Sequence, residues 1–146
     1  MTIIIDGFVA EYRWLSNFWI EPDKTHVEGE YQAEKHRGFP WREVTILRQG
    51  PKKAKKLGRR FQLTDYQLME WNNRKNQVMR ELLIGKINDH PSIAVALIST
   101  GDIELVEKNN WHDNYWGDCT CLRCYKVGEN HLGKIWMALR AELAGA

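Results

Sequence analysis

The sequence predicts a single α+β domain over residues 1–146, mainly helical and with a small β-sheet. A chain of 146 residues suits one domain, and no internal repeat, low-complexity stretch or Pro/Ser-rich linker divides it. Apolar residues recur at helical spacing over much of the second half, whereas β-branched runs are few and short. The hydrophobic fraction of 43% and the charged fraction of 27% are those of a protein with a buried core.

The N-terminal segment predicts a strand followed by a turn. Thr2–Ile5 is a short β-branched run that ends at Asp6-Gly7, as an opening strand would. Tyr12–Trp19 is dense in aromatic residues but also carries polar ones, among them Asn17. This mixture favours a semi-buried turn that lines a pocket.

Two short helices are expected next. Glu28–Arg37 can form a helix that ends at Gly38, because glycine readily adopts the backbone conformation that closes a helix. Lys52–Leu57 predicts a short basic helix that ends at Gly58.

The clearest element is a long helix that begins near Thr64 or Asp65 and runs to about Ile87. Either residue can cap it, since the capping side chain accepts from free backbone N–H groups. Its helically spaced apolar residues are Leu68, Trp71, Val78, Met79, Leu82 and Leu83. Lys75 lies on the same face, so its amine either extends out of the core to solvent or points into a polar pocket.

The rest of the sequence predicts a helix, a strand, a loop and a final helix. The first helix starts at Asp89-His90-Pro91 and ends at Thr100-Gly101, and Ile103–Glu107 alternates as a short strand. Asn109–Lys126 is polar, aromatic and cysteine-rich, which is typical of a long functional loop. The apolar stripe of the C-terminal helix comprises Leu132, Ile135, Trp136, Leu139 and Leu143.

Positive charge is concentrated in one segment. Seven basic residues and no acidic one lie between Arg48 and Arg60, so the remainder of a chain of net charge +2 carries −5. Such a segment can attract a phosphate or pyrophosphate group, or it can be a solvated helix face. With so small a net charge and no known motif, binding of double-stranded DNA is not expected.

Three cysteines, Cys119, Cys121 and Cys124, lie within six residues. An odd, tightly clustered set does not suit a secreted disulfide scaffold and fits a reducing compartment. A tetrahedral zinc site would need a fourth ligand, with His112 and His131 as the nearest candidates. The alternative is a loop that merely carries cysteines, so the sequence assigns no metal ligand, and no cofactor is expected.

Carboxylates are the main candidates for chemistry. Glu28 and Glu30 lie at the start of a helix, where capping or favourable interaction with the helix dipole is the simple explanation. Asp113 lies among three aromatic residues of the long loop, where it is otherwise an ordinary turn residue. Composition and spacing alone therefore reach a globular domain that carries a pocket.

An ordered set of motifs resembles the NADAR (YbiA-like) family. In the first half, the matches are Trp14-Leu15-Ser16-Asn17-Phe18 to FLSNF, Val27-Glu28-Gly29-Glu30-Tyr31-Gln32-Ala33-Glu34-Lys35 to VEHAYQAxK, Gly58-Arg59 to GR, and Trp71, Lys75 and Met79 to WxxxKxxxM. In the second half, they are Thr100-Gly101-Asp102 with Leu105 and Glu107 to TGDxxLxE, Asp113-Asn114-Tyr115-Trp116-Gly117 to DxxWG, and Gly128, Asn130, Leu132, Gly133, Met137 and Arg140 to GxNxLGxxLMxxR. Each motif is weak alone, and the order makes the resemblance specific. The chain departs from the pattern at Trp14, at Gly29-Glu30, where the family segment has His-Ala, and in the cysteine cluster.

The resemblance implies a YbiA-like fold and an N-glycosidase. The family's substrates are phosphoribosylated aminopyrimidines of early riboflavin biosynthesis or ADP-ribosylated guanine, free or on nucleic acid; both join a ribose that carries phosphate to an amino nitrogen of a heterocycle. By position, Glu28, Trp71 and Asp113 match the family's essential glutamate, tryptophan and aspartate, and Lys35 matches a lysine that can act covalently. The remaining substrate-binding candidates are Asn17, Arg59, Trp116, Gly117 and Asn130.

Two mechanisms and one rival function stay open at this point. Glu28 and Asp113 can act on opposite sides of the anomeric carbon, or Lys35 can form a Schiff base with the opened sugar. The rival is a non-catalytic module that binds ADP-ribose or nucleic acid, since aromatic side chains stack on any base. The sequence contains no membrane-length apolar run, predicts a cytoplasmic protein and leaves the oligomeric state open.

Overall fold

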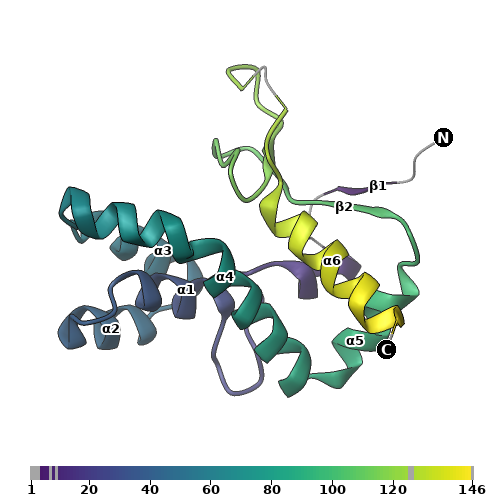
Figure 1. The fold of residues 1–146 in the computed structure, drawn as a ribbon, viewed down its shortest axis with the longest axis horizontal. Coiled ribbons are helices and arrows are strands. Elements are labelled where there is room, and N and C mark those ends of the chain that lie inside the picture. Colours follow the sequence, from purple (N-terminus) through teal and green to yellow (C-terminus); the bar gives the residue numbers. More distant parts are fainter. Residues whose placement is uncertain (1–3, 7, 9, 125–126, 146) are drawn as a thin grey trace. The chain divides into compact units, whose positions relative to one another are not determined.

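The computed structural model describes residues 4–145 except residues 7, 9 and 125–126 (Figure 1). These residues group into two compact units. The central unit is Asn17–Gly85, and the terminal unit joins Met1–Ser16 to Lys86–Ala146. The prediction of one domain over residues 1–146 stays a prediction.

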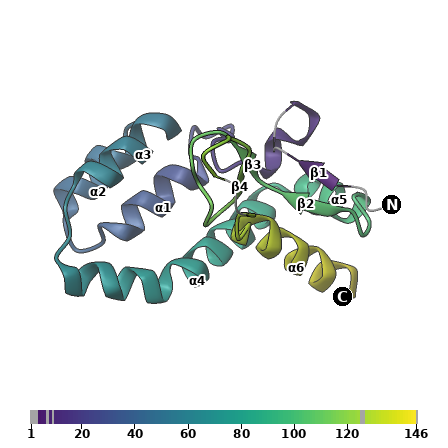
Figure 2. The ribbon, with the colours of Figure 1, turned by 90° about the horizontal axis from the view of Figure 1, so that it is seen from above.

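Three helices form the first part of the central unit. Helix α1 (Val27–Lys35) lies beside α2 (Pro40–Leu47) and α3 (Pro51–Arg60) (Figure 2). Their shared core consists of Ala33, Ile46 and Ala54, with Leu57 and Phe61 packed against it. Helix α2 was not predicted, because Gly38 was expected to end a helix and no new helix was expected directly after it. Pro40 instead begins the next helix, where a missing backbone N–H removes no helical bond.

Helix α3 also differs from its prediction. It continues through Gly58 to Arg60, so the expected end at Gly58 is wrong. An ideal Cβ at Gly58 would lie 1.9 Å from Oε1 of Gln32, so a close approach between helices requires the glycine there.

The long helix α4 (Asp65–Asp89) is confirmed together with its cap. The Gln67 N–H donates to Oγ1 of Thr64 at 3.2 Å, and the Thr64 N–H donates to Oε1 of Gln67 at 2.9 Å. This reciprocal pair satisfies two backbone donors at the helix start.

The terminal unit is built around the C-terminal helix. Strand β1 (Ile4–Asp6) pairs in parallel with β2 (Glu104–Val106), and α6 (His131–Gly145) packs against β2 and against α5 (Pro91–Ser99). The predicted first strand overlaps β1 at Ile4 and Ile5; Thr2 and Ile3 lie outside the described residues.

The predicted aromatic turn forms the short 3-10 helix η1 (Ala10–Leu15) at its start. Leu15 is fully buried, and its carbonyl accepts from Nε1 of Trp136 at 3.0 Å. The ring of Trp14 meets the ring of Trp136 edge to face at 6.2 Å. These contacts anchor η1 on α6.

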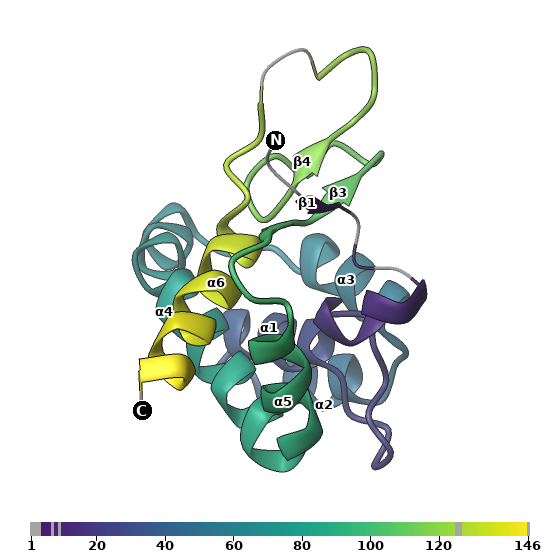
Figure 3. The same ribbon diagram turned by 90° about the vertical axis from the view of Figure 1, so that its right-hand side faces the viewer.

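The long loop is more regular than predicted. It contains the parallel pair β3 (Lys108–Asn109) and β4 (Asp118–Cys119), visible side by side in Figure 3. The backbone N–H groups of residues 129–132 donate to the carbonyl oxygens of residues 114–117 at 2.8–3.1 Å. The start of α6 is thus joined to the loop, and these N–H groups are not available to an anion.

The mainly helical α+β class with a small sheet is confirmed. Among the described residues, no helix has the length and apolarity needed to span a membrane.

Candidate functional site

The predicted site residues fall into two groups, one in each unit, and each group is described by itself. The central unit holds Asn17, Glu28, Lys35, Arg59 and Trp71. The terminal unit holds Asp113, Trp116, Gly117 and Asn130.

Glu28 is a buried carboxylate on the first turn of α1. Its Oε1 accepts from Nε2 of Gln32 at 3.0 Å, one helical turn further along. Its backbone N–H donates to the carbonyl oxygen of Asn17 at 3.0 Å. The first turn of α1 therefore places a buried acid against the side-chain amide of Gln32 and the backbone of Asn17.

The side chains of Asn17 and Gln32 each keep a buried amide oxygen without a donor. Oδ1 of Asn17 and Oε1 of Gln32 have no hydrogen-bond partner in the part of the chain that the structure describes. The Asn17 amide nitrogen faces Sδ of Met79 at 3.5 Å. An unpaired buried acceptor costs about 1–3 kcal/mol, so the oxygen of Gln32, whose amide contacts the carboxylate, indicates a place where a hydroxyl or amino group of a ligand donates.

Lys35 ends α1 on the same face, seven residues after Glu28. Burial lowers the pKa of its amine below the ordinary 10.5; the cations Arg59 and Lys75 lower it further, and Glu28 raises it. Nζ donates weakly to the carbonyl oxygen of Gly58 at 3.4 Å. A larger fraction of this amine is therefore neutral, and able to act as a nucleophile, than in an exposed lysine.

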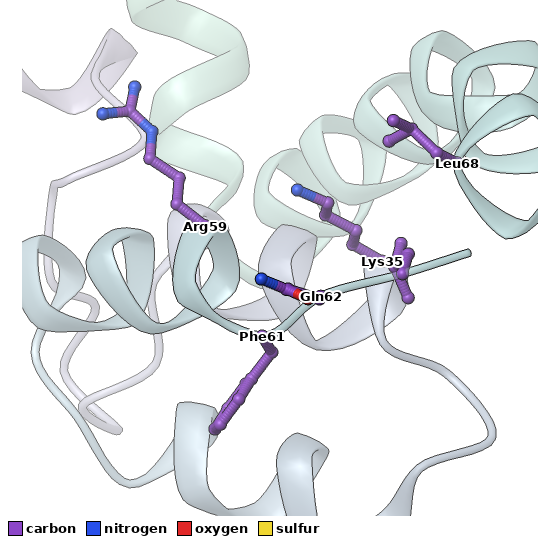
Figure 4. A pocket seen from close by; sticks show the side chains of 6 residues that line it. Lys35, Arg59, Phe61, Gln62 and Leu68 are labelled. Atoms are coloured by element: carbon purple, nitrogen blue, oxygen red, sulfur yellow. The ribbon is translucent and has the colours of Figure 1, made fainter. Parts of the chain in front are cut away.

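Lys35 and Arg59 line one cavity of about 220 Å³. Figure 4 shows Lys35 reaching from α1 and Leu68 from α4, with the Phe61 ring turned away from Lys35. Arg60, the next residue, lines a separate cavity of about 360 Å³ with Lys52, Lys53 and Lys56 of α3. Of the basic residues that line these two cavities, Arg59 is the one beside Lys35.

Trp71 is buried, with 4% of its surface exposed. Its ring lies 5.0 Å from that of Tyr31, and the guanidinium of Arg74 lies over it at 4.9 Å. These contacts join α4 to α1, and stacking of Trp71 on a substrate base stays a prediction.

Asp113 is held in a tight turn in the terminal unit. Its Oδ1 accepts from the backbone N–H groups of Tyr115 at 3.2 Å and Trp116 at 2.9 Å. Asn109 fixes the same turn, since its Oδ1 accepts from the Asp113 N–H at 3.1 Å and its Nδ2 donates to the Asp113 carbonyl at 2.7 Å. One carboxylate oxygen is therefore used by the turn, and a catalytic role would fall to Oδ2.

Asn130 and Gly117 have clear structural roles. Asn130 adopts a positive φ of 53°, and its amide accepts from the Glu107 N–H and donates to the Leu105 carbonyl, both at 2.9 Å. A Cβ on Gly117 would lie 2.2 Å from the Glu107 carbonyl oxygen. Trp116 is half-buried and meets Tyr115 edge to face at 4.9 Å. Substrate binding by these three residues stays a prediction.

Gln32 was not among the predicted site residues, and Lys75 was predicted only to reach solvent or a polar pocket. Gln32 touches the candidate acid, and its spacing of four from Glu28 was the available signal. Lys75 lowers the pKa of Lys35, and its place on the apolar face of α4 was the signal. Lys75 is half-buried, and whether its amine reaches solvent or a polar pocket stays a prediction.

Gly29 is explained by the residue that caps α1. Nδ1 of His26 accepts from the Gly29 N–H at 2.9 Å, and a Cβ at position 29 would lie 2.4 Å from the His26 ring. The imidazole occupies the space of a side chain at position 29, so this chain has glycine where the family segment has histidine.

Gly58→Ala should reduce activity more than stability. The added methyl group would displace the flexible end of Gln32, and with it the hydrogen bond to Glu28. We expect catalytic efficiency to fall by about 10-fold, the equivalent of one hydrogen bond to a charged group. Gly85→Ala, at a helical glycine with no neighbour within 4 Å, is the control and should stabilise by about 0.5–1 kcal/mol. Thermal unfolding gives the stability of both variants, and steady-state kinetics give their activity. Equal activity of the two variants would contradict the role assigned to Gly58.

The fold is mainly helical α+β, and one helix of its central unit carries a buried carboxylate and a lysine of lowered pKa on the same face. The lysine lines a small cavity. The NADAR domain model matches residues 8–144, and the chain belongs to this family. It is 36% identical over 155 residues to an N-glycosidase of Nostoc punctiforme, covering 98% of this chain and 93% of that one. N-glycosidase YbiA of Escherichia coli is 32% identical over 92% of this chain and 83% of its own.

The YbiA-like fold is confirmed. The solved NMR structure of E. coli YbiA matches with a TM-score of 0.77 at 31% identity, over 99% of this chain and 87% of that one. A riboflavin biosynthesis protein of Vibrio vulnificus is 32% identical over 80% of this chain and 30% of its own length.

Proposed function

We propose that the protein is an N-glycosidase that hydrolyses the bond between a phosphorylated ribose and an amino nitrogen of a heterocycle. The observation that carries the proposal is the buried Glu28 carboxylate in contact with the Gln32 amide, whose oxygen lacks a donor. Ribose hydroxyls are donors of the required kind. The N-glycosidase names of two similar proteins support the same reaction class.

Glu28 supplies the charge that this reaction needs. Cleavage of an N-glycosidic bond develops positive charge on the ribose, and a desolvated carboxylate stabilises it more strongly than one in water. Asn17 and Gln32 orient the sugar by accepting from its hydroxyls. Asp113 is proposed as the second carboxyl group, which protonates the leaving nitrogen or activates water. It would act through Oδ2, because Oδ1 accepts from the backbone of the turn.

A covalent route uses Lys35. The ribosylamine opens to an imine, the neutral Lys35 amine adds to C1, and the heterocyclic amine leaves with a proton. Water then adds to the Lys35 imine, the C1–N bond breaks, and the free sugar phosphate departs as its aldehyde while the lysine is regenerated.

The substrate is proposed to be either a phosphoribosylated aminopyrimidine of riboflavin biosynthesis or ADP-ribosylated guanine. The name of the Vibrio protein favours the first. Hydrolysis of both compounds, side by side, decides between them. If neither compound releases a free sugar phosphate, the proposed activity is wrong.

Arg59→Ala should weaken binding of a phosphorylated substrate, because Arg59 shares a cavity with Lys35. We expect KM to rise by about 10-fold, the loss of one charged hydrogen bond, with little change for the dephosphorylated compound. Arg60→Ala is the matched control, because Arg60 lines the other cavity. Equal effects of the two variants would exclude a specific role for Arg59, and insensitivity of KM to salt would exclude a charge contact.

A binding module for ADP-ribose or nucleic acid is the alternative. A buried carboxylate repels an anionic ligand, so a protein that only binds gains nothing from Glu28. In that case, Glu28→Gln would tighten binding and no ribose would be released.

A further inference from the structure

Four potential metal ligands meet in the terminal unit. They are His112, Cys119, Cys121 and Cys124, and their ligand atoms all lie within 4.8 Å of one another. Nδ1 of His112 lies 3.3 Å from Sγ of Cys121, 3.4 Å from Sγ of Cys124 and 3.9 Å from Sγ of Cys119. In a tetrahedral zinc site with Zn–N of about 2.1 Å and Zn–S of about 2.3 Å, nitrogen and sulfur lie about 3.6 Å apart. The spacing in the protein fits a single tetrahedral ion.

The local backbone explains why the thiols converge. Cys119 ends β4, and alternate residues of an extended segment point to the same side, so Cys121 joins it. The Cys124 N–H donates to the Cys121 carbonyl at 3.2 Å, which closes the turn between two cysteines separated by two residues. This spacing is one that structural zinc sites use for a ligand pair.

The histidine is held toward the cysteines by an uncommon backbone conformation. His112 has a positive φ of 67°, a region that non-glycine residues seldom occupy. His131, the other candidate from the sequence, instead contacts Glu129 at 3.3 Å and the ring of Tyr115 at 4.3 Å. The geometry selects His112 as the fourth ligand.

We propose that His112, Cys119, Cys121 and Cys124 bind one Zn²⁺ as a structural site. Four protein ligands close a tetrahedral shell and leave no position for water or substrate, which separates this site from a catalytic metal. Soft thiolates with one imidazole favour zinc over magnesium or calcium.

The ion would act on the loop rather than on the substrate. His112 directly precedes Asp113, and Cys119 pairs with Asn109, which holds the Asp113 turn. One ion would therefore join both ends of the segment that carries the candidate aspartate, in addition to the bonds from the start of α6.

The test uses the full chain without a histidine tag, purified under reducing conditions without a chelator. We expect about one zinc per chain by elemental analysis, and Co²⁺ in its place should give the intense visible absorption of a tetrahedral thiolate site. Chelation of the metal should lower the melting temperature. Absence of zinc together with an octahedral, weakly coloured Co²⁺ complex would overturn the proposal.

Single substitutions distinguish the loss of a zinc-binding side chain from a loss of the fold. His112→Asn removes the imidazole while keeping a residue type that tolerates positive φ, and should lower zinc affinity. Cys124→Ser should reduce bound zinc to below about 0.1 per chain after dialysis. His112→Cys should retain zinc and strengthen the sulfur-to-cobalt absorption, which reports on the metal even if activity is lost. His131→Ala is the control and should keep zinc unchanged; loss of zinc in this variant alone would show that the wrong histidine is assigned.

Discussion

Glu28→Gln should lower kcat by about 10²–10⁴-fold while the fold is retained. The substitution keeps the size of the side chain and an oxygen that can accept from Gln32, but removes the negative charge. Since that charge is proposed to stabilise the oxocarbenium-like transition state, the loss should fall on kcat more than on KM. The rate at which the free sugar phosphate is released, measured against substrate concentration, gives kcat and KM.

Glu30→Gln is the matched control for this variant. Glu30 lies on the same turn of α1, two residues away, and is more exposed than Glu28. Its substitution changes the net charge equally but leaves the buried carboxylate in place, so kcat should stay within about threefold. An equal loss in both variants would point to general electrostatics, and an active Glu28→Gln protein would remove Glu28 from the mechanism.

The long periodic elements were predictable because local rules determine them. The apolar stripe and the N-terminal cap of α4 predict the same helix. The apolar stripe of α6 predicts that helix without any knowledge of its tertiary contacts. Helix α2 was missed because the signals of one helix ending and another beginning overlap within Gly38–Pro40. Gly58 was misread because its role depends on Gln32, which is distant in sequence, and spacing cannot show a contact between helices.

The family motifs mix residues of two kinds, which sequence alone does not separate. The Leu15 carbonyl accepts from Trp136, and the Asn130 side chain donates to the backbone of β2, so Leu15 and Asn130 hold the fold. Glu28 is instead a buried carboxylate, and Lys35 is a half-buried amine of lowered pKa that lines a cavity. The motifs placed this pair on one helix, but the unpaired amide oxygens of Asn17 and Gln32 depend on packing and were visible only in the structure.

Lys35→Met should abolish the covalent route and lower kcat by about 10²–10⁴-fold. Borohydride added during turnover should reduce the imine and attach the sugar phosphate to Lys35 in the native protein, as peptide mass spectrometry would show. Lys75→Met should still form the adduct, since Lys75 acts only on the charge of Lys35. No adduct, together with an active Lys35→Ala protein, would exclude the Schiff base.

The pH dependence distinguishes a nucleophile from a lysine that merely packs. Activity should rise with pH as the Lys35 amine loses its proton and level off above its pKa, which lies below 10.5. Lys75→Met removes a cation that lowers this pKa, so the rise should move to higher pH. An unchanged profile in Lys75→Met would contradict the role of Lys35.

The free energy of unfolding should depend on the ionisation of the same Lys35 amine. Because the pKa of Lys35 is lower in the folded chain than the ordinary 10.5, the unfolded chain binds more protons between those two values. The free energy of unfolding should therefore gain a positive contribution as pH rises through that window, and burial of the charged amine should cost stability at neutral pH. Lys35→Met should remove this contribution and raise the melting temperature at pH 7 while activity is lost. This opposition between stability and activity is expected of a lysine retained for chemistry.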